Sequence, residues 1–217
     1  MVPSHSVAGG VDAPRTELAA DGGPATPEQR VVAAAIRCIA RWGLAKTTLD
    51  DIAREAGCSR ATVYRLFPGG KSSLIVTVGQ HEVARLLLEV TSRLDDAHDV
   101  DTMLCVAIRT AGAFVAENDA LQMLVRHEPE TLLPFLAFDR VDPLLEAATT
   151  FVSPYLARHL QPDHAAEVVE WGARLVLSYM FTPNPTIDLT DDAEVRRLVS
   201  TYVLPGISPA TNPSSTH

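Results

Sequence analysis

The most regular stretch of this chain runs from Thr47 to Leu74 and reads TTLDDIAREAGCSRATVYRLFPGGKSSL. Two short amphipathic segments meet at Ala56-Gly57, and a Pro-Gly-Gly break follows the second of them. Two helices of about seven to ten residues, joined by a turn of three or four, have the dimensions of a helix-turn-helix. We therefore expect a first helix that begins at Thr47 or Thr48 and a second that begins at Ser59.

The two faces of this unit differ in chemistry. The apolar side chains of Ile52, Val63 and Phe67 are spaced to pack against Ile36 and Ile39 of a preceding helix over residues 27–42. The opposite face of the second helix carries donors that are long enough to reach base edges and phosphates. These donors are Ser59, Arg60, Thr62 and Arg65, with Tyr64 and Lys71 as further phosphate donors. The pattern indicates a DNA-reading surface, although helical hairpins that never touch DNA carry similar residues.

Charge is distributed unevenly along the chain, whose formal net charge is −9. Residues 28–76 hold eight Lys or Arg against four Asp or Glu, a net charge of +4. From residue 77 onward there are nine Arg against twenty acids, a net charge of −11. A basic module on an acidic body is the asymmetry expected when one end alone meets a polyanion.

The rest of the chain indicates a helical body. Apolar residues recur at i, i+3, i+4 and i+7, and alternating β patterns do not persist, so we expect an all-α fold of about nine helices. The predicted domains are a helix-turn-helix domain over residues 25–75 and a larger helical domain over residues 76–207. Gly, Pro, Ala and Asp in residues 1–24, and the polar composition of residues 208–217, predict disordered tails.

The residues between positions 30 and 74 resemble the sequence pattern of a known protein family. The segments AA…IARWG, TTLDDIAREAG and SRATVYRLF, followed by K..L, resemble the N-terminal domain of the TetR family of bacterial regulators in order and spacing. There are three departures from the family pattern. Ile39 stands where an aromatic residue is usual, Cys58 stands where Val is common, and three residues separate Phe67 from Lys71 where two are usual.

The resemblance assigns roles to individual positions of the module. It implies that Arg60, Ala61 and Thr62 face bases, and that Arg65 faces either bases or phosphates. The positions that it implies face phosphates are Thr48, Ser59, Tyr64 and Lys71.

One recognition helix reads only a few base pairs, so we expect a homodimer on a palindromic operator. The resemblance implies the same, with an interface formed by helices over about residues 163–181 and 191–204. We expect part of each helix to lie in that interface, and some of their apolar residues to belong to the ordinary core of the chain. The second helix carries a clean apolar stripe. The stripe consists of Val195, Leu198, Val199 and Val203.

The resemblance further implies a pocket for a small effector among the middle helices. Met and aromatic side chains there are candidate lining residues, although such stripes are more often ordinary core, and their apolar character indicates a lipophilic effector such as a fatty acyl compound. The candidates are Met103, Phe114, Met123, Phe135, Phe138, Phe151, Trp171 and Met180.

Other classes of function find little support in the sequence. No H-E-x-x-H, G-x-S-x-G, P-loop or G-x-G-x-x-G is present, and the three Cys are far apart, so we expect no enzyme, metal or cofactor. His127, Glu128 and Glu130 could form a metal or acid–base cluster, but a solvated helix end is the favoured interpretation. No apolar run reaches the roughly 20 residues of a membrane span, and there is no secretory signal, so we expect a cytoplasmic protein.

Together these features predict a one-component transcriptional regulator, with repression relieved by the effector as its usual mode. An activator, or a repressor whose effector promotes DNA binding, is the alternative within regulation. A helical ligand-binding or interaction module that does not bind DNA is the alternative from another class.

Overall fold

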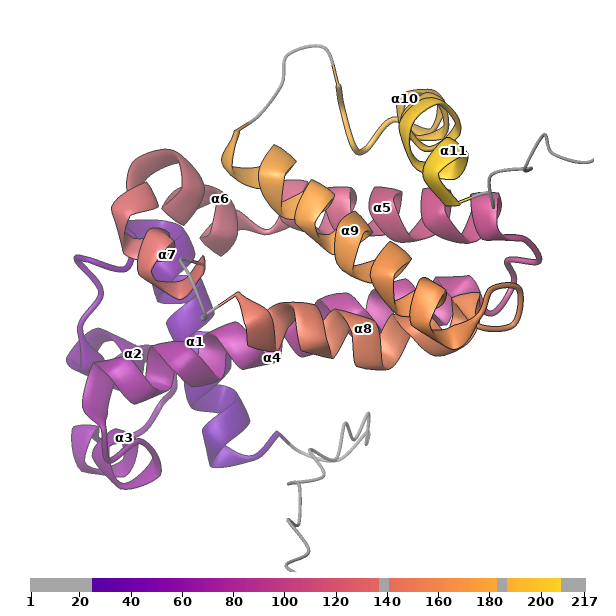
Figure 1. The fold of residues 1–217 in the computed structure, drawn as a ribbon. Coiled ribbons are helices and arrows are strands. Elements are labelled where there is room, and N and C mark those ends of the chain that lie inside the picture. The colour runs from indigo at the N-terminus through magenta and orange to yellow at the C-terminus, as the bar shows by residue number, and fades with distance from the viewer. Residues whose placement is uncertain (1–24, 137–140, 183–186, 208–217) are drawn as a thin grey trace, which may run out of the picture.

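The computed structural model describes residues 25–136, 141–182 and 187–207, and all regular structure in these ranges is helical (Figure 1). The all-α class expected from the sequence is therefore confirmed. The expected disordered tails lie outside the described residues. The helices are α1 Pro27–Trp42, α2 Leu49–Glu55, α3 Arg60–Leu66, α4 Gly70–Leu94, α5 Val100–Glu117, α6 Asp119–His127, α7 Pro129–Leu136, α8 Asp142–Leu156, α9 Pro162–Phe181, α10 Asp192–Leu198, a π-helical turn Val199–Val203, and α11 Leu204–Ile207.

The first three helices begin at residues that cap them. Thr26 caps α1 in a reciprocal capping box with Gln29, Thr48 caps α2, and Ser59 caps α3. Each hydroxyl accepts a hydrogen bond from a backbone N–H of the first turn that has no partner inside the helix. Gly43 ends α1 with φ of 79°. The predicted helix starts in this region are therefore confirmed.

Helices α1 to α3 and the beginning of α4 enclose a small core of their own. Ile52 and Val63 are fully buried there, Phe67 is buried beside them, and Ile36 packs against the same cluster. The expectation that Ile39 joins this core was wrong. Ile39 packs instead with Leu44 and with Ala120 of α6, because it lies on the side of α1 that contacts the body.

The body forms a larger core from α4, α5, α8, α9 and the C-terminal segment α10–α11. In Figure 1, α2 and α3 lie at one end of the molecule, and α4 runs from that end into the body beside α8. The apolar stripe of the last helix belongs to the core of its own chain, as the sequence left open for some of its residues. These side chains pack inside their own chain, where they are at most 6% exposed: Val195, Leu198, Val199 and Val203.

Candidate nucleic-acid interface

Helix α3 separates a buried face from a solvent face. Val63 has no exposed surface, whereas Arg60, Ala61, Tyr64 and Arg65 are all exposed. Positions i, i+1, i+4 and i+5 of a helix share one side, so these four side chains form a continuous surface. Their contacts with DNA stay predictions, but α3 presents them together to solvent at the end of the molecule.

Arg60 is held in place on this surface by two neighbours. Its Nη1 donates to Oδ2 of Asp50 in α2 at 2.9 Å, and its Nη2 donates to the phenol oxygen of Tyr64 at 3.2 Å. The guanidinium carbon also lies 5.4 Å from the centroid of the Tyr64 ring, which is cation–π geometry. The hydrogen bond to Tyr64 and the charge of Asp50 raise the pKa of Arg60 above its already high value, so it carries its charge throughout the physiological range.

The predicted phosphate donors Thr48 and Ser59 already serve as helix caps. Oγ1 of Thr48 accepts from the backbone N–H of Asp51 at 3.2 Å and donates to the Asp51 carboxylate at 2.5 Å. The hydroxyl and the backbone N–H of Thr48 both donate to the Asp51 carboxylate, and these two hydrogen bonds lower the pKa of that carboxyl. The hydroxyls of Ser59 and Thr62 lie 2.9 Å apart, and Ser59 accepts from the backbone N–H of Thr62. A role on phosphate stays a prediction for both caps.

Lys71 lies against the loop between α1 and α2. Its Nζ donates to the carbonyl oxygen of Leu44 at 2.6 Å, and the side chain is partly buried. The same loop is tied by Thr47, whose hydroxyl donates to the carbonyl oxygen of Gly43 at 2.6 Å. In this structure the ammonium of Lys71 therefore helps to fix the loop that leads into α2, and its contact with phosphate stays a prediction.

The favoured interpretation of Glu128 as part of a solvated helix end was wrong. Its Oε2 accepts from the backbone N–H groups of Leu44 and Ala45 at 2.9 and 3.0 Å, so the corner between α6 and α7 is bonded to the α1–α2 loop. A Cβ atom on Gly43 would overlap this carboxylate. The carboxylate can approach the loop closely because residue 43 has no side chain.

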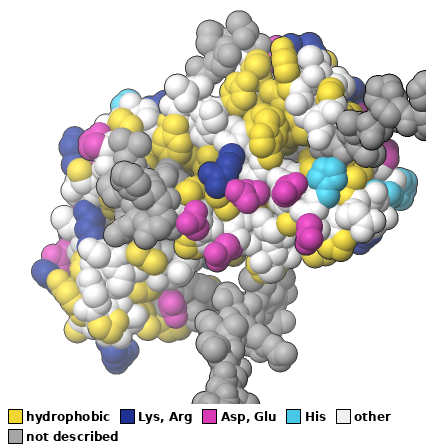
Figure 2. Space-filling model, viewed as in Figure 1, with side chains coloured by type: hydrophobic (Ala, Val, Ile, Leu, Met, Phe, Trp, Pro, Cys, Tyr) yellow, Lys and Arg dark blue, Asp and Glu magenta, His cyan; other side chains and the backbone are white. Residues whose placement is uncertain are grey.

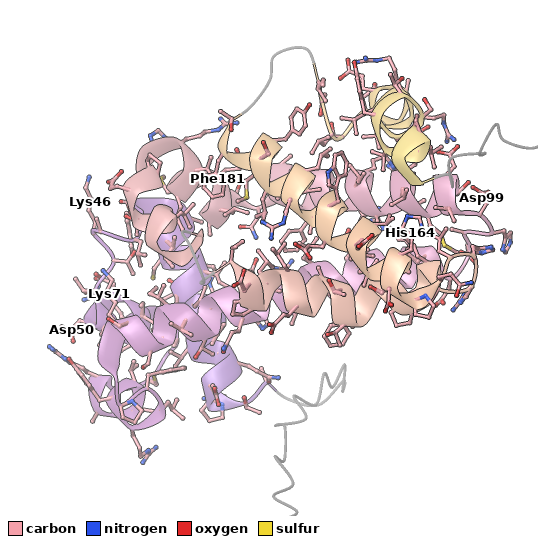
Figure 3. All side chains as sticks on the ribbon, in the orientation of Figure 1. Lys46, Asp50, Lys71, Asp99, His164 and Phe181 are labelled. Atoms are coloured by element: carbon pink, nitrogen blue, oxygen red, sulfur yellow. The ribbon has the colours of Figure 1, made fainter. Side chains whose placement is uncertain are left out.

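Lys and Arg outnumber Asp and Glu around α2 and α3, since residues 28–76 hold eight of the former and four of the latter. Figure 2 shows several Lys or Arg side chains around that end of the molecule and a band of acidic side chains over α8 and α9. Lys46, which was not among the residues expected to bind DNA, lies exposed in the α1–α2 loop. Figure 3 places it at the same end as Asp50 and Lys71. Its charge was visible in the sequence, but its location beside the cap of α2 depends on the fold of the loop.

The eight candidates for an effector pocket do not share one environment. Met103 and Phe114 are buried in α5, and Met123 and Met180 are partly buried. The side chains of Phe135 and Phe138 lie outside the described part of the chain.

Phe151 and Trp171 are 46% and 47% exposed, and their role in lining an effector pocket stays a prediction. Each of these side chains lies outside the row of buried residues through which its helix packs against the rest of the body. In α8 the buried side chains are Leu145, Ala148, Val152 and Leu156.

A shallow hollow of about 280 Å³ lies between α9 and the C-terminal segment. Trp171 lines it from α9, and Tyr202, which is 64% exposed, lines it from the π-helical turn. Its full lining is His164, Glu167, Val168, Trp171, Tyr202, Val203 and Gly206. Two large aromatic side chains are thus left uncovered on one face of the body.

Comparisons with known proteins agree with this geometry. Residues 31–78 match the model of the family described as bacterial regulatory proteins, tetR family. The chain is 28% identical over 204 residues to the uncharacterized HTH-type transcriptional regulator Rv1255c of Mycobacterium tuberculosis, covering 93% of this chain and 91% of that protein.

Solved structures show the same fold. The TetR family repressor AlkX from Dietzia sp., implicated in biodegradation of n-alkanes, superposes with a TM-score of 0.66 at 20% identity, covering 85% of this chain and 98% of that one. The regulator FadR from Bacillus subtilis in complex with stearoyl-CoA superposes with a TM-score of 0.59 at 14% identity, covering 79% and 97%.

The capped hairpin of α2 and α3 defines a helix-turn-helix DNA-binding protein. Residues 31–78 match the tetR family of bacterial regulatory proteins, and over nearly its whole length the chain is similar to a protein described as an HTH-type transcriptional regulator. Among the described residues no helix is long and apolar enough to cross a membrane. Nor do those residues bring three or more His, Cys, Asp or Glu together as metal ligands, so the His127, Glu128 and Glu130 cluster is not formed.

Proposed function

We propose that this protein is a homodimeric repressor that binds a palindromic operator and is released by a small apolar effector. The observation that carries the proposal is the solvent face of α3, where Arg60, Ala61, Tyr64 and Arg65 stand together at the basic end of the molecule. A single helix of this length reads only a few base pairs, so specific binding requires two copies on two half-sites.

The hollow between α9 and the C-terminal segment supports a homodimer. Trp171 and Tyr202 present large aromatic surface to solvent there, and aromatic side chains are enriched in subunit interfaces. Trp171→Glu should therefore shift the protein toward the mass of a monomer in light scattering. Leu88→Glu is the matched control, because Leu88 is also 47% exposed but lies on α4. Equal masses for both variants and the unmodified protein would contradict this interface.

The effector is proposed to be apolar because Met103 lies in the apolar core of the body and Phe114 is buried in the same helix. FadR of the same fold is in complex with stearoyl-CoA, and AlkX is implicated in n-alkane degradation, which supports this class of compound. Mass spectrometry of an organic extract of the purified protein tests it. A stoichiometric lipophilic compound is expected, and a polar one in its place would contradict the proposal.

Selection of genomic fragments by the purified protein tests the central part of the proposal. We expect a palindrome to be enriched, with half-sites separated by about one helical turn of DNA or a multiple of it. Placing the enriched fragment ahead of a reporter gene distinguishes repression from activation by the sign of the change. Enrichment of no common sequence would favour a helical module that does not bind DNA.

A further inference from the structure

Asp50 contacts the recognition helix from outside it. It lies in the first turn of α2, and its carboxylate oxygen Oδ2 is 2.9 Å from Nη1 of Arg60, the first residue of α3. Asp50 is not among the residues that the family resemblance places on DNA. We propose that Asp50 is a positioning residue which aims Arg60 at one base and weakens binding to all other DNA. This inference rests on the proposed function.

Asp50 and Tyr64 together fix the orientation of the Arg60 side chain. A guanidinium has five N–H donors in a rigid planar fork. Asp50 takes a donor of Nη1 and Tyr64 takes a donor of Nη2, and the Tyr64 ring also lies within cation–π distance of the guanidinium. Contacts from two helices therefore select one orientation of a long side chain that would otherwise sample many. The remaining N–H groups stay available for the edge of a base, and less rotamer freedom is lost on binding.

Asp50 also acts on DNA through its negative charge. The side chain of Asp50 is 52% exposed, on the same end of the molecule as Lys46 and Lys71 (Figure 3). A carboxylate at that position repels phosphates of any sequence. It also competes with them for Arg60, so non-specific DNA has to break the Asp50–Arg60 ion pair to use this guanidinium. At the operator, the same pair is kept while Arg60 reaches its base.

The orientation of Arg60 strengthens binding to the operator, whereas the charge of Asp50 weakens binding to any DNA. This difference in sign distinguishes a positioning role from a merely structural one. An acid in the first turn of a helix also stabilises that helix through its dipole. If that were the whole role of Asp50, its loss would lower thermal stability and change the affinity for all DNA in the same direction. A positioning role instead predicts weaker binding to the operator and tighter binding to unrelated DNA.

The test uses the full-length protein, the duplex enriched by genomic selection and a shuffled duplex of the same composition. Asp50→Asn should weaken binding to the enriched duplex by roughly 5-fold or more, the lower end of the range for one bidentate base contact. It should tighten binding to the shuffled duplex by about 2-fold or more, because one negative charge beside the phosphates is gone.

Two controls make the result specific to Asp50 and Arg60. Glu55→Gln removes a charge from the same helix, but Glu55 pairs with Arg37 at 2.7 Å, so the ratio of the two affinities should not change. In an Arg60→Ala background, Asp50→Asn should also leave the ratio unchanged, because there is no guanidinium to position.

A variant that keeps the charge guards against loss of the fold. Asp50→Glu retains an acid in the first turn of α2 but moves the carboxylate. The affinity for the enriched duplex should therefore fall relative to that for the shuffled duplex, and binding to the shuffled duplex should not become tighter. Melting curves verify that each variant folds.

An unchanged ratio in Asp50→Asn would overturn the positioning role while leaving the proposed function intact. Failure of the unmodified protein to prefer any duplex would overturn both.

Discussion

The bond between Glu128 and the α1–α2 loop allows a quantitative prediction. Glu128→Ala removes the acceptor of the backbone N–H groups of Leu44 and Ala45, which lie 2.9 and 3.0 Å from the carboxylate. The bond to Ala45 is exposed, and water can replace it there. Leu44 is 7% exposed, and leaving a buried N–H without a partner costs about 1–3 kcal/mol. For a chain of this size that loss lowers the melting temperature by about 2–12 °C.

Two measurements together test this prediction. Thermal unfolding gives the loss of stability, and hydrogen exchange read by NMR gives the protection of the Leu44 amide itself. Glu128→Gln keeps an oxygen that can accept, so it should lose less stability than Glu128→Ala. Glu130→Ala is the control, because Glu130 is an exposed acid two residues further on. It should leave the exchange of the Leu44 amide unchanged and lose only the roughly 0.3–1 kcal/mol that an acid in the first turn of α7 contributes.

A double-mutant cycle with Gly43 isolates the contact. Gly43→Ala is costly for two reasons: its φ of 79° and ψ of 166° lie in a region open almost only to Gly, and its Cβ would overlap the Glu128 carboxylate. In a Glu128→Ala background the overlap is absent, so the double variant should lose less stability than the two single variants combined. Additive losses, or an unchanged exchange rate of the Leu44 amide in Glu128→Ala, would refute the reasoning.

Three further outcomes are expected. Ile52→Ala, at a position with no exposed surface, should lower the free energy of unfolding in urea by about 2–5 kcal/mol, and a loss near zero would contradict the small core. Thr48→Ala should cost about 1 kcal/mol at neutral pH. Because the Thr48 hydrogen bonds lower the pKa of Asp51, their stabilisation is present above the usual carboxyl pKa of 3.8 and lost below it as pH falls through the lowered value. The difference in stability between the two proteins should therefore shrink in acid to the part that comes from the cap of the Asp51 backbone N–H, and a difference that does not change with pH would argue against this coupling. Burial raises the pKa of the Cys105 thiol to about 11, so alkylation at pH 8 should modify partly exposed Cys58 first, and rapid labelling of both would show that Cys105 is accessible.

The parts of the fold that could be predicted from the sequence depend on interactions close along the chain. Thr26, Thr48 and Ser59 cap their helices through bonds to residues three positions ahead, and Gly43 ends α1 through local backbone geometry. The separation of α3 into a buried and an exposed face follows from helical periodicity in the same way, because Val63 stands out from its polar neighbours.

The contacts that could not be predicted join residues far apart in the chain. Glu128 and Leu44 are 84 positions apart, and a carboxylate near a Pro gives no sign that it will bond to backbone N–H groups of another helix pair. From the sequence alone, Asp50 is an ordinary acid in the first turn of a helix. Its contact with Arg60 depends on the angle between α2 and α3. Phe151 and Trp171 are apolar, but periodicity alone did not show that their helices pack through other stripes.

The dependence on salt of the affinity for the enriched duplex shows whether this protein reads DNA through its basic N-terminal domain. Titration by fluorescence anisotropy at several salt concentrations should give a steep linear fall of log affinity with log salt, together with a preference of at least about 1,000-fold over a shuffled duplex. Arg60→Ala should lose most of that preference while keeping weak binding to both duplexes. A shallow salt dependence, with equal affinity for the two duplexes, would contradict the account.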